Sequence, residues 1–139
     1  MTGDESRLLR GFQDGSLVEF HHRDHVHLAW IYVREHGLED GLPRFVADLR
    51  AFARAKGAPH LFHATITWAY LTLVAERRAL TPDLDWDAFA QAHGDLLVWK
   101  PSILDRYYSA ERLWSETARA CFVLPDTAYA GLAPRGAPR

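Results

Sequence analysis

The sequence predicts an all-α protein, an irregular helical bundle of three long helices with several short ones in a single domain. Apolar residues recur at helical spacing in three long segments, 21–36, 40–56 and 63–78. The alternating pattern of half-buried strands is absent, and 139 residues are enough for one core. We therefore expect one helical domain over residues 1–126. Residues 127–139, rich in Ala, Gly and Pro, are expected to form a disordered tail.

The composition of the chain indicates which partners to expect and in which compartment the protein is located. The chain is 48% hydrophobic and 24% charged, with a formal charge of -2. This balance lacks the basic footprint of a nucleic-acid-binding protein. The N-terminus does not resemble a secretory signal, and no apolar run reaches membrane-spanning length. A single cysteine, Cys121, excludes an intrachain disulfide and fits a reducing compartment. We expect a cytoplasmic protein that binds neither nucleic acid nor membrane.

The first half of the chain predicts three helices. Segment 6–13 has its apolar residues at helical spacing and is followed by the breaker Asp14-Gly15-Ser16. A histidine-rich helix over 21–36 ends at Gly37, a typical C-terminal cap. Segment 40–56 is the clearest amphipathic helix, closed by Gly57. Its predicted buried stripe is Leu42, Phe45, Val46, Leu49, Phe52 and Ala53.

The second half predicts one long helix and several short ones. Residues 63–78 run without Gly or Pro, which favours a helix despite the β-branched residues near its start. A short helix capped by Asp85 should stop at Gly94, and Pro101 should divide 95–108 into two short helical pieces. Ser115 can cap a last helix over 116–123, before Pro125.

Five of the eight histidines lie between Phe20 and His36. On a helix, one half of the circumference of 21–36 carries His21, His22, His25, Val26, Leu28, Ala29, Tyr32, Val33 and His36. Histidines and a tyrosine thus share a face with aliphatic residues that must be buried, and buried polar groups need partners. His27 lies on the opposite, charged face with Arg23, Asp24 and Arg34, so we expect it at the surface.

His63 should join this histidine cluster. Short connections after residues 36 and 56 make successive helices roughly antiparallel neighbours. The first and third long helices therefore begin at the same end of the bundle. We expect His21, His22 and His25 to meet His63 there.

Four segments, 20–25, 62–67, 107–109 and 118–126, resemble those of a group of small bacterial proteins usually described only as uncharacterised. The resemblance covers most of the chain, from Phe20 to Asp126. The group's pattern is F-x-H-x-D-H, Tyr-His-x-Thr-Ile-Thr and A-R-x-x-F-x-x-P-D, and Phe62 stands here in place of the tyrosine. The resemblance brings no activity, but it implies a shared polar set of His22, Asp24, His25, His63, Thr65, Thr67, Arg119 and Asp126.

Three interpretations of the histidine cluster compete. In the first, His22, His25 and His63 bind a divalent metal (zinc, iron or manganese), and Asp24 or Glu19 orients a histidine. In the second, the cluster works without metal. His25, His63, Tyr32 and Thr67 would then be the catalytic groups, and His21, Thr65 and Tyr70 would hold a small molecule. In the third, the histidines are structural and bond backbone carbonyls.

A second group of polar residues lies near the C-terminus. Arg119 sits among core residues and needs a carboxylate or an anionic ligand, and Asp126 is the nearest carboxylate in sequence. We expect a structural salt bridge between the two. Tyr107, Arg119 and Asp126 remain candidate ligand-binding residues.

These patterns predict a protein that binds a metal ion or a small organic ligand in a histidine-rich pocket, with hydrolytic or acid/base turnover as one outcome. Two alternatives belong to other classes: a non-catalytic protein that sequesters a small molecule, and a helical interaction module with structural histidines. A homodimer is compatible with each of them.

Overall fold

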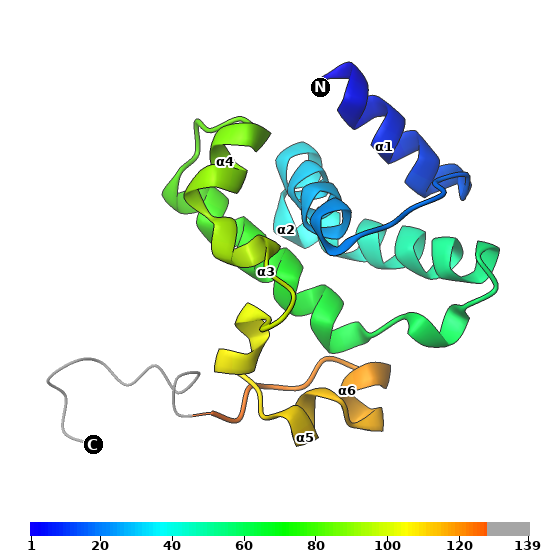
Figure 1. Ribbon diagram of the computed structural model, residues 1–139, viewed down its shortest axis with the longest axis vertical. Coiled ribbons are helices and arrows are strands. Elements are labelled where there is room, and N and C mark those ends of the chain that lie inside the picture. Colours follow the sequence, from blue (N-terminus) through cyan, green and yellow to red (C-terminus); the bar gives the residue numbers. More distant parts are fainter. Residues whose placement is uncertain (128–139) are drawn as a thin grey trace, which may run out of the picture.

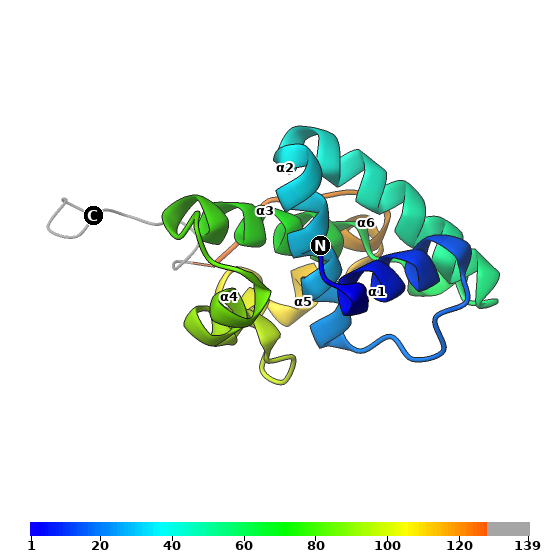
Figure 2. The ribbon, with the colours of Figure 1, turned by 90° about the horizontal axis from the view of Figure 1, so that it is seen from above.

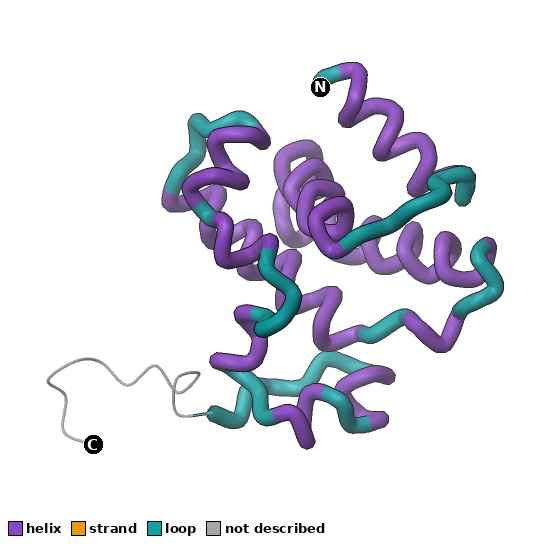
Figure 3. Tube along the Cα trace, in the orientation of Figure 1, coloured by secondary structure: helices purple, strands orange, loops and turns teal. Residues whose placement is uncertain are grey.

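The computed structural model describes residues 1–127, and every regular element in this part of the chain is helical. Figure 3 shows the helices and the loops that connect them. The all-α fold class is therefore confirmed. The elements are α1 (Gly3–Asp14), α2 (His22–Ala55), η1 (Pro59–Leu61), α3 (Ala64–Leu80), α4 (Trp86–Ala92), η2 (Gly94–Leu97), η3 (Ile103–Arg106), α5 (Ala110–Leu113) and α6 (Glu116–Ala120).

The long helix α2 bends at Gly37 and so forms two arms. Gly37 has φ 75° and ψ 174°, a conformation that residues with a side chain rarely adopt. The two arms correspond to the two helices predicted on either side of this glycine, and Figure 1 shows the change of direction. At Gly41 an added Cβ would lie 3.0 Å from the carbonyl oxygen of Tyr32, so the arms approach each other closely at the bend.

The core forms where α2 packs against α3 and α1, and α3 also packs against α6. Figures 1 and 2 show α1 and α3 on different sides of α2. Half of the predicted stripe of the second arm is buried, namely Phe45, Leu49 and Phe52, and its other members, Leu42, Val46 and Ala53, are partly buried. Within residues 1–127, the residues with 0% exposed surface are Phe12, Val26, Leu28, Ala29, Phe45, Thr65, Tyr70, Leu71, Val74, Leu96 and Ala118.

The first arm of α2 is buried on more than one face. Trp30 and Ile31 are almost fully buried, and the Trp30 ring lies 5.7 Å from that of Trp86 at the start of α4. The expectation that His27 lies at the surface is therefore wrong. Its imidazole stacks on Trp86 at 4.1 Å, and its Nε2 lies 2.8 Å from Glu5 Oε2. Helices α1 and α4 cover the face that appears charged and exposed in the isolated helix.

The short C-terminal elements follow the predicted caps. Asp85 accepts a hydrogen bond from the Ala88 amide at 2.9 Å, and Ser115 Oγ accepts one from the Ala118 amide at 3.1 Å. Helix α6 ends at Ala120, earlier than the predicted 123.

The predicted tail begins at 127. Thr127 itself donates its backbone amide to the Tyr107 carbonyl at 3.2 Å, and 128–139 lie outside the described residues. No helix within residues 1–127 combines the length and apolarity needed to cross a lipid bilayer.

Candidate ligand-binding site

His25 and His63 lie on the wall of one cavity, as the predicted topology requires. His25 is in the first turns of α2, and His63 is the N-cap of α3. The cavity has a volume of about 490 Å³, within the range of about 300 to 1,000 Å³ typical of small-molecule sites. Its lining residues are Phe20, His25, Leu49, Phe52, Ala53, Lys56, Ala58, Leu61, Phe62, His63, Ile66, Thr67, Trp99, Trp114 and Arg119.

A second, smaller hollow of about 280 Å³ adjoins this cavity. The two share Phe20, His25, Ile66 and Trp99, and the smaller one adds His21 and His22. His25 therefore lines both hollows, whereas His21 and His22 line only the smaller one. The walls common to both are mostly aromatic and aliphatic.

His25 has a buried ring nitrogen without a partner. Its Nε2 is buried and makes no hydrogen bond. The imidazole stacks on Phe45 with ring centroids 5.4 Å apart and an angle of 6°. Burial lowers the pKa of His25 to about 3, with a smaller contribution from neighbouring His22. The ring is therefore neutral at physiological pH, and its Nε2 has no hydrogen-bond partner.

His63, in contrast, has both ring nitrogens occupied. Nδ1 accepts from the Ile66 amide at 3.1 Å and caps α3, while Nε2 lies 2.7 Å from the Leu113 carbonyl oxygen and donates to it. These bonds fix the tautomer with the proton on Nε2. Burial also lowers the pKa of His63. His63 thus serves as a helix cap that connects α3 to α5, and its ring forms part of the cavity wall.

His22 and His21 differ in their surroundings. His22 is half-buried, its Nε2 donates to the Leu96 carbonyl at 2.9 Å, and burial lowers its pKa. Its ring centroid is 6.2 Å from that of His25. His21 is exposed, and its Nε2 lies 3.2 Å from Glu19 Oε2. Asp24 accepts a hydrogen bond from the His21 amide, so it stabilises the start of α2 and does not orient an imidazole.

The predicted metal triad of His22, His25 and His63 is not assembled. Among residues 1–127, no group of three or more His, Cys, Asp or Glu side chains is placed to hold a metal ion. His22 and His63 each use Nε2 as a donor to a backbone carbonyl, so that nitrogen offers no lone pair to a metal in this arrangement.

The predicted hydroxyl groups are mostly engaged in structure. Thr67 lines the cavity, but its Oγ1 donates to the His63 carbonyl at 2.8 Å. Thr65 Oγ1 donates to the Cys121 carbonyl and accepts from the Val123 amide, which joins α3 to the chain after α6. The Tyr70 hydroxyl is 2.7 Å from Ser102 Oγ, and burial raises the pKa of Tyr70 to about 12.

Tyr32 lies away from the cavity. Its hydroxyl donates to Asp48 Oδ2 at 2.5 Å and is 3.3 Å from Gln13 Nε2. Burial, followed by the bond to Asp48, raises the pKa of Tyr32 well above its ordinary value. Tyr32 therefore joins α1 to both arms of α2 and does not contact the His25 cavity.

The expected salt bridge between Arg119 and Asp126 is wrong. Asp126 accepts from the backbone amide and the hydroxyl of Ser109, at 2.8 and 2.7 Å. Arg119 donates through Nη1 to the His60 carbonyl at 3.3 Å and lines the cavity. The early end of α6 separates the two, because the chain after Ala120 is not helical and carries Asp126 to the start of α5. Tyr107 lines a separate hollow of about 210 Å³.

Several cavity residues were not among the predicted site residues. Lys56, Trp99 and Trp114 line the cavity, as do the apolar side chains of the second arm of α2. For Lys56, the one feature of the sequence that could have drawn attention to it is its position at a helix end, beside Gly57. Trp99 is distant from His25 in the sequence. Its place beside the cavity depends on the tertiary structure, so the sequence does not show it.

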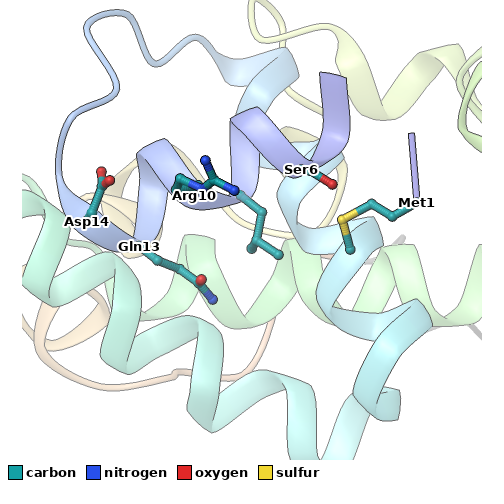
Figure 4. Close-up of a pocket in the computed structure, with 6 residues that line it drawn as sticks. Met1, Ser6, Arg10, Gln13 and Asp14 are labelled. Atoms are coloured by element: carbon teal, nitrogen blue, oxygen red, sulfur yellow. The ribbon is translucent and has the colours of Figure 1, made fainter. Parts of the chain in front are cut away.

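Two other hollows are less suited to a ligand. One of about 380 Å³ is lined only by Met1 and α1 residues, and Figure 4 shows its labelled side chains along one side of that helix. The other, of about 630 Å³, lies between α1, α2 and α4 and includes buried Glu5. Trp30 Nε1 and Arg34 Nη2 are unpartnered donors there, yet Asp4, Asp85 and Asp87 also line it and would repel an anionic acceptor.

The fold and this site together define a class, an all-α protein with a cavity lined mainly by aromatic and aliphatic side chains. Comparison with models of protein families, with curated proteins and with solved structures found no match to this chain.

Proposed function

We propose that this protein binds a small organic molecule in the cavity between His25 and His63, with His25 as the polar contact. Two observations carry the proposal: His25 lines the cavity, and its buried Nε2 has no hydrogen-bond partner. A buried polar atom without a partner costs about 1 to 3 kcal/mol, and a hydrogen bond from a ligand to His25 would remove this cost. A ligand with a complementary polar group supplies that hydrogen bond.

The same geometry favours binding over acid/base turnover. An efficient general base has a pKa near the working pH, whereas burial places that of His25 at about 3. The nitrogens of His63 are both engaged in hydrogen bonds, so it has no free lone pair with which to take a proton. The alternative of a sequestering protein is therefore better supported than the enzyme.

The proposal can be tested with N-phenyl-1-naphthylamine, a neutral aromatic probe whose fluorescence rises in apolar surroundings. We expect saturable binding to the wild-type protein with a stoichiometry near one, accompanied by energy transfer from Trp99 and Trp114, which line the cavity.

The informative variant is Ala53→Phe, which places a bulky side chain in the cavity, and the matched control is Ala51→Phe on the exposed side of the same helix. Ala53→Phe should weaken probe binding about tenfold or more, while Ala51→Phe should not. Circular dichroism and urea unfolding establish that both variants are folded. Absence of probe binding to the wild type, or equal binding to both variants, would contradict the proposal.

A further inference from the structure

We infer that the ligand of this cavity is an organic anion with an aromatic body, whose charged group is held by Lys56 and Arg119. This inference rests on the proposed function and adds the chemical class of the ligand. The first observation is the sign of the charge around the cavity. Lys56 and Arg119 are its cationic lining residues, and none of the described residues that line it is acidic.

Neither cation is neutralised by a carboxylate within residues 1–127. The ion pairs of this part of the chain involve other arginines and histidines. Lys56 Nζ lies 5.5 Å from the centre of the Phe52 ring, and Arg119 uses Nη1 for the His60 carbonyl. A guanidinium has five N–H donors, so Arg119 retains donors for a carboxylate or sulfonate oxygen. Arg50, whose guanidinium carbon is 4.1 Å from the centre of the Phe62 ring, adds positive potential nearby.

The second observation is how exposure is distributed over the cavity walls. Phe52, Phe62, Ile66 and Leu49 are buried, whereas Lys56 is exposed and Arg119 is half-buried. The buried part of the wall is therefore apolar, and the positive charges lie toward the solvent side, where Leu61 and Trp114 are also exposed. An amphipathic molecule fits this arrangement, with its ring system inside and its anionic group at the mouth.

The aromatic character of the body follows from the wall composition. Stacked and edge-to-face arrangements between rings add to the energy of apolar burial, which favours a planar ring over a flexible chain. The aromatic side chains that line the cavity are Phe20, Phe52, Phe62, Trp99 and Trp114. His25 lies beside one of these rings, because its ring centroid is 6.0 Å from that of Phe20.

The inference can be tested with two probes, one neutral and one that carries a single negative charge. 8-Anilinonaphthalene-1-sulfonate is N-phenyl-1-naphthylamine with an added sulfonate. We expect the wild-type protein to bind the sulfonate about tenfold more tightly, because hydrogen bonds to charged groups exceed neutral ones. Raising the salt concentration from about 0.05 M to about 0.5 M should weaken binding of the sulfonate and leave the neutral probe unchanged.

The double variant Lys56→Gln/Arg119→Gln should abolish the preference for the sulfonate and retain binding of the neutral probe. Arg119→Lys should preserve the preference, which separates the charge of Arg119 from its contact with His60. Arg54→Gln is the matched control, because it removes a positive charge two residues from Lys56 at an exposed position that does not line the cavity.

The outcomes separate the two proposals. If neither probe binds in the cavity, the proposed function fails and this inference fails with it. If the neutral probe binds as tightly as the sulfonate, or if the double variant keeps the preference, the proposed function stands and the anionic ligand is refuted.

Discussion

Replacing His25 by leucine should stabilise the protein, because the native residue buries a nitrogen without a partner. Leucine has a similar volume and no polar atom. Removing the unpaired group should contribute about 1 to 3 kcal/mol to the free energy of unfolding. Loss of the ring contacts with Phe45 and Phe20 should offset about 0.5 to 1.5 kcal/mol of this gain. Near neutral pH we therefore expect a net stabilisation of about 1 kcal/mol.

The stabilisation of the His25→Leu variant relative to the wild type should increase as the pH falls. The unfolded chain protonates His25 at the ordinary pKa of 6.5, whereas the folded protein does so only at about 3. Above pH 6.5 His25 is neutral in both states, so the free energy of unfolding of the wild type is not reduced by this group. It decreases as the pH falls from 6.5 toward 3, because the unfolded chain then binds a proton that the folded protein does not. At about pH 5 the wild type should have lost about 2 kcal/mol through this group alone, a loss that the leucine variant avoids.

Urea unfolding of both proteins near pH 7 and near pH 5 measures these differences. His36→Leu is the matched control at an exposed histidine, and it should change the free energy of unfolding by less than about 0.5 kcal/mol at either pH. A His25→Leu variant less stable than the wild type at both pH values, or a difference between them that does not depend on pH, would refute the reasoning.

Three further predictions concern the fold. Glu5→Ala should destabilise by about 3 to 5 kcal/mol in urea unfolding, because Glu5 is buried against His27 and Arg34; a change below about 1 kcal/mol would show that this cluster is dispensable. Leu71→Ala should cost about 2 to 5 kcal/mol and leave probe affinity unchanged, since Leu71 is fully buried away from the cavity. In a double-mutant cycle, Arg119→Ala and Asp126→Ala should be additive within about 0.5 kcal/mol; a larger coupling would indicate the salt bridge that the structure lacks.

The sequence predicted those features of the fold that depend on local signals. Gly37 and Gly57 adopt positive φ where the helices were expected to end. Asp85 and Ser115 cap the helices that follow them. The bend at Gly37 also brings the start of α3 back toward the start of α2, so His25 and His63 share a cavity. Each of these outcomes follows from backbone preference or from the order of helices along the chain.

The remaining features depend on tertiary packing that helical periodicity cannot show. His27 appeared exposed because its helical face is charged, but Trp86 of α4 stacks on it and Glu5 of α1 binds it. His63 appeared to be a ligand because it lies near other histidines, whereas the free amide of Ile66 and the carbonyl of Leu113 occupy its nitrogens. In each case, a partner distant in sequence decides the role of the residue.

The most direct test of the proposed binding site is to record the imidazole NMR signals of the protein during titration with N-phenyl-1-naphthylamine. The proposal predicts that the signals of His25 and His63 shift in proportion to the fraction of bound probe. Those of His36 and His93, which do not line the cavity, should stay in place. Saturable probe binding that leaves His25 unchanged, or that shifts His36 or His93 instead, would contradict it.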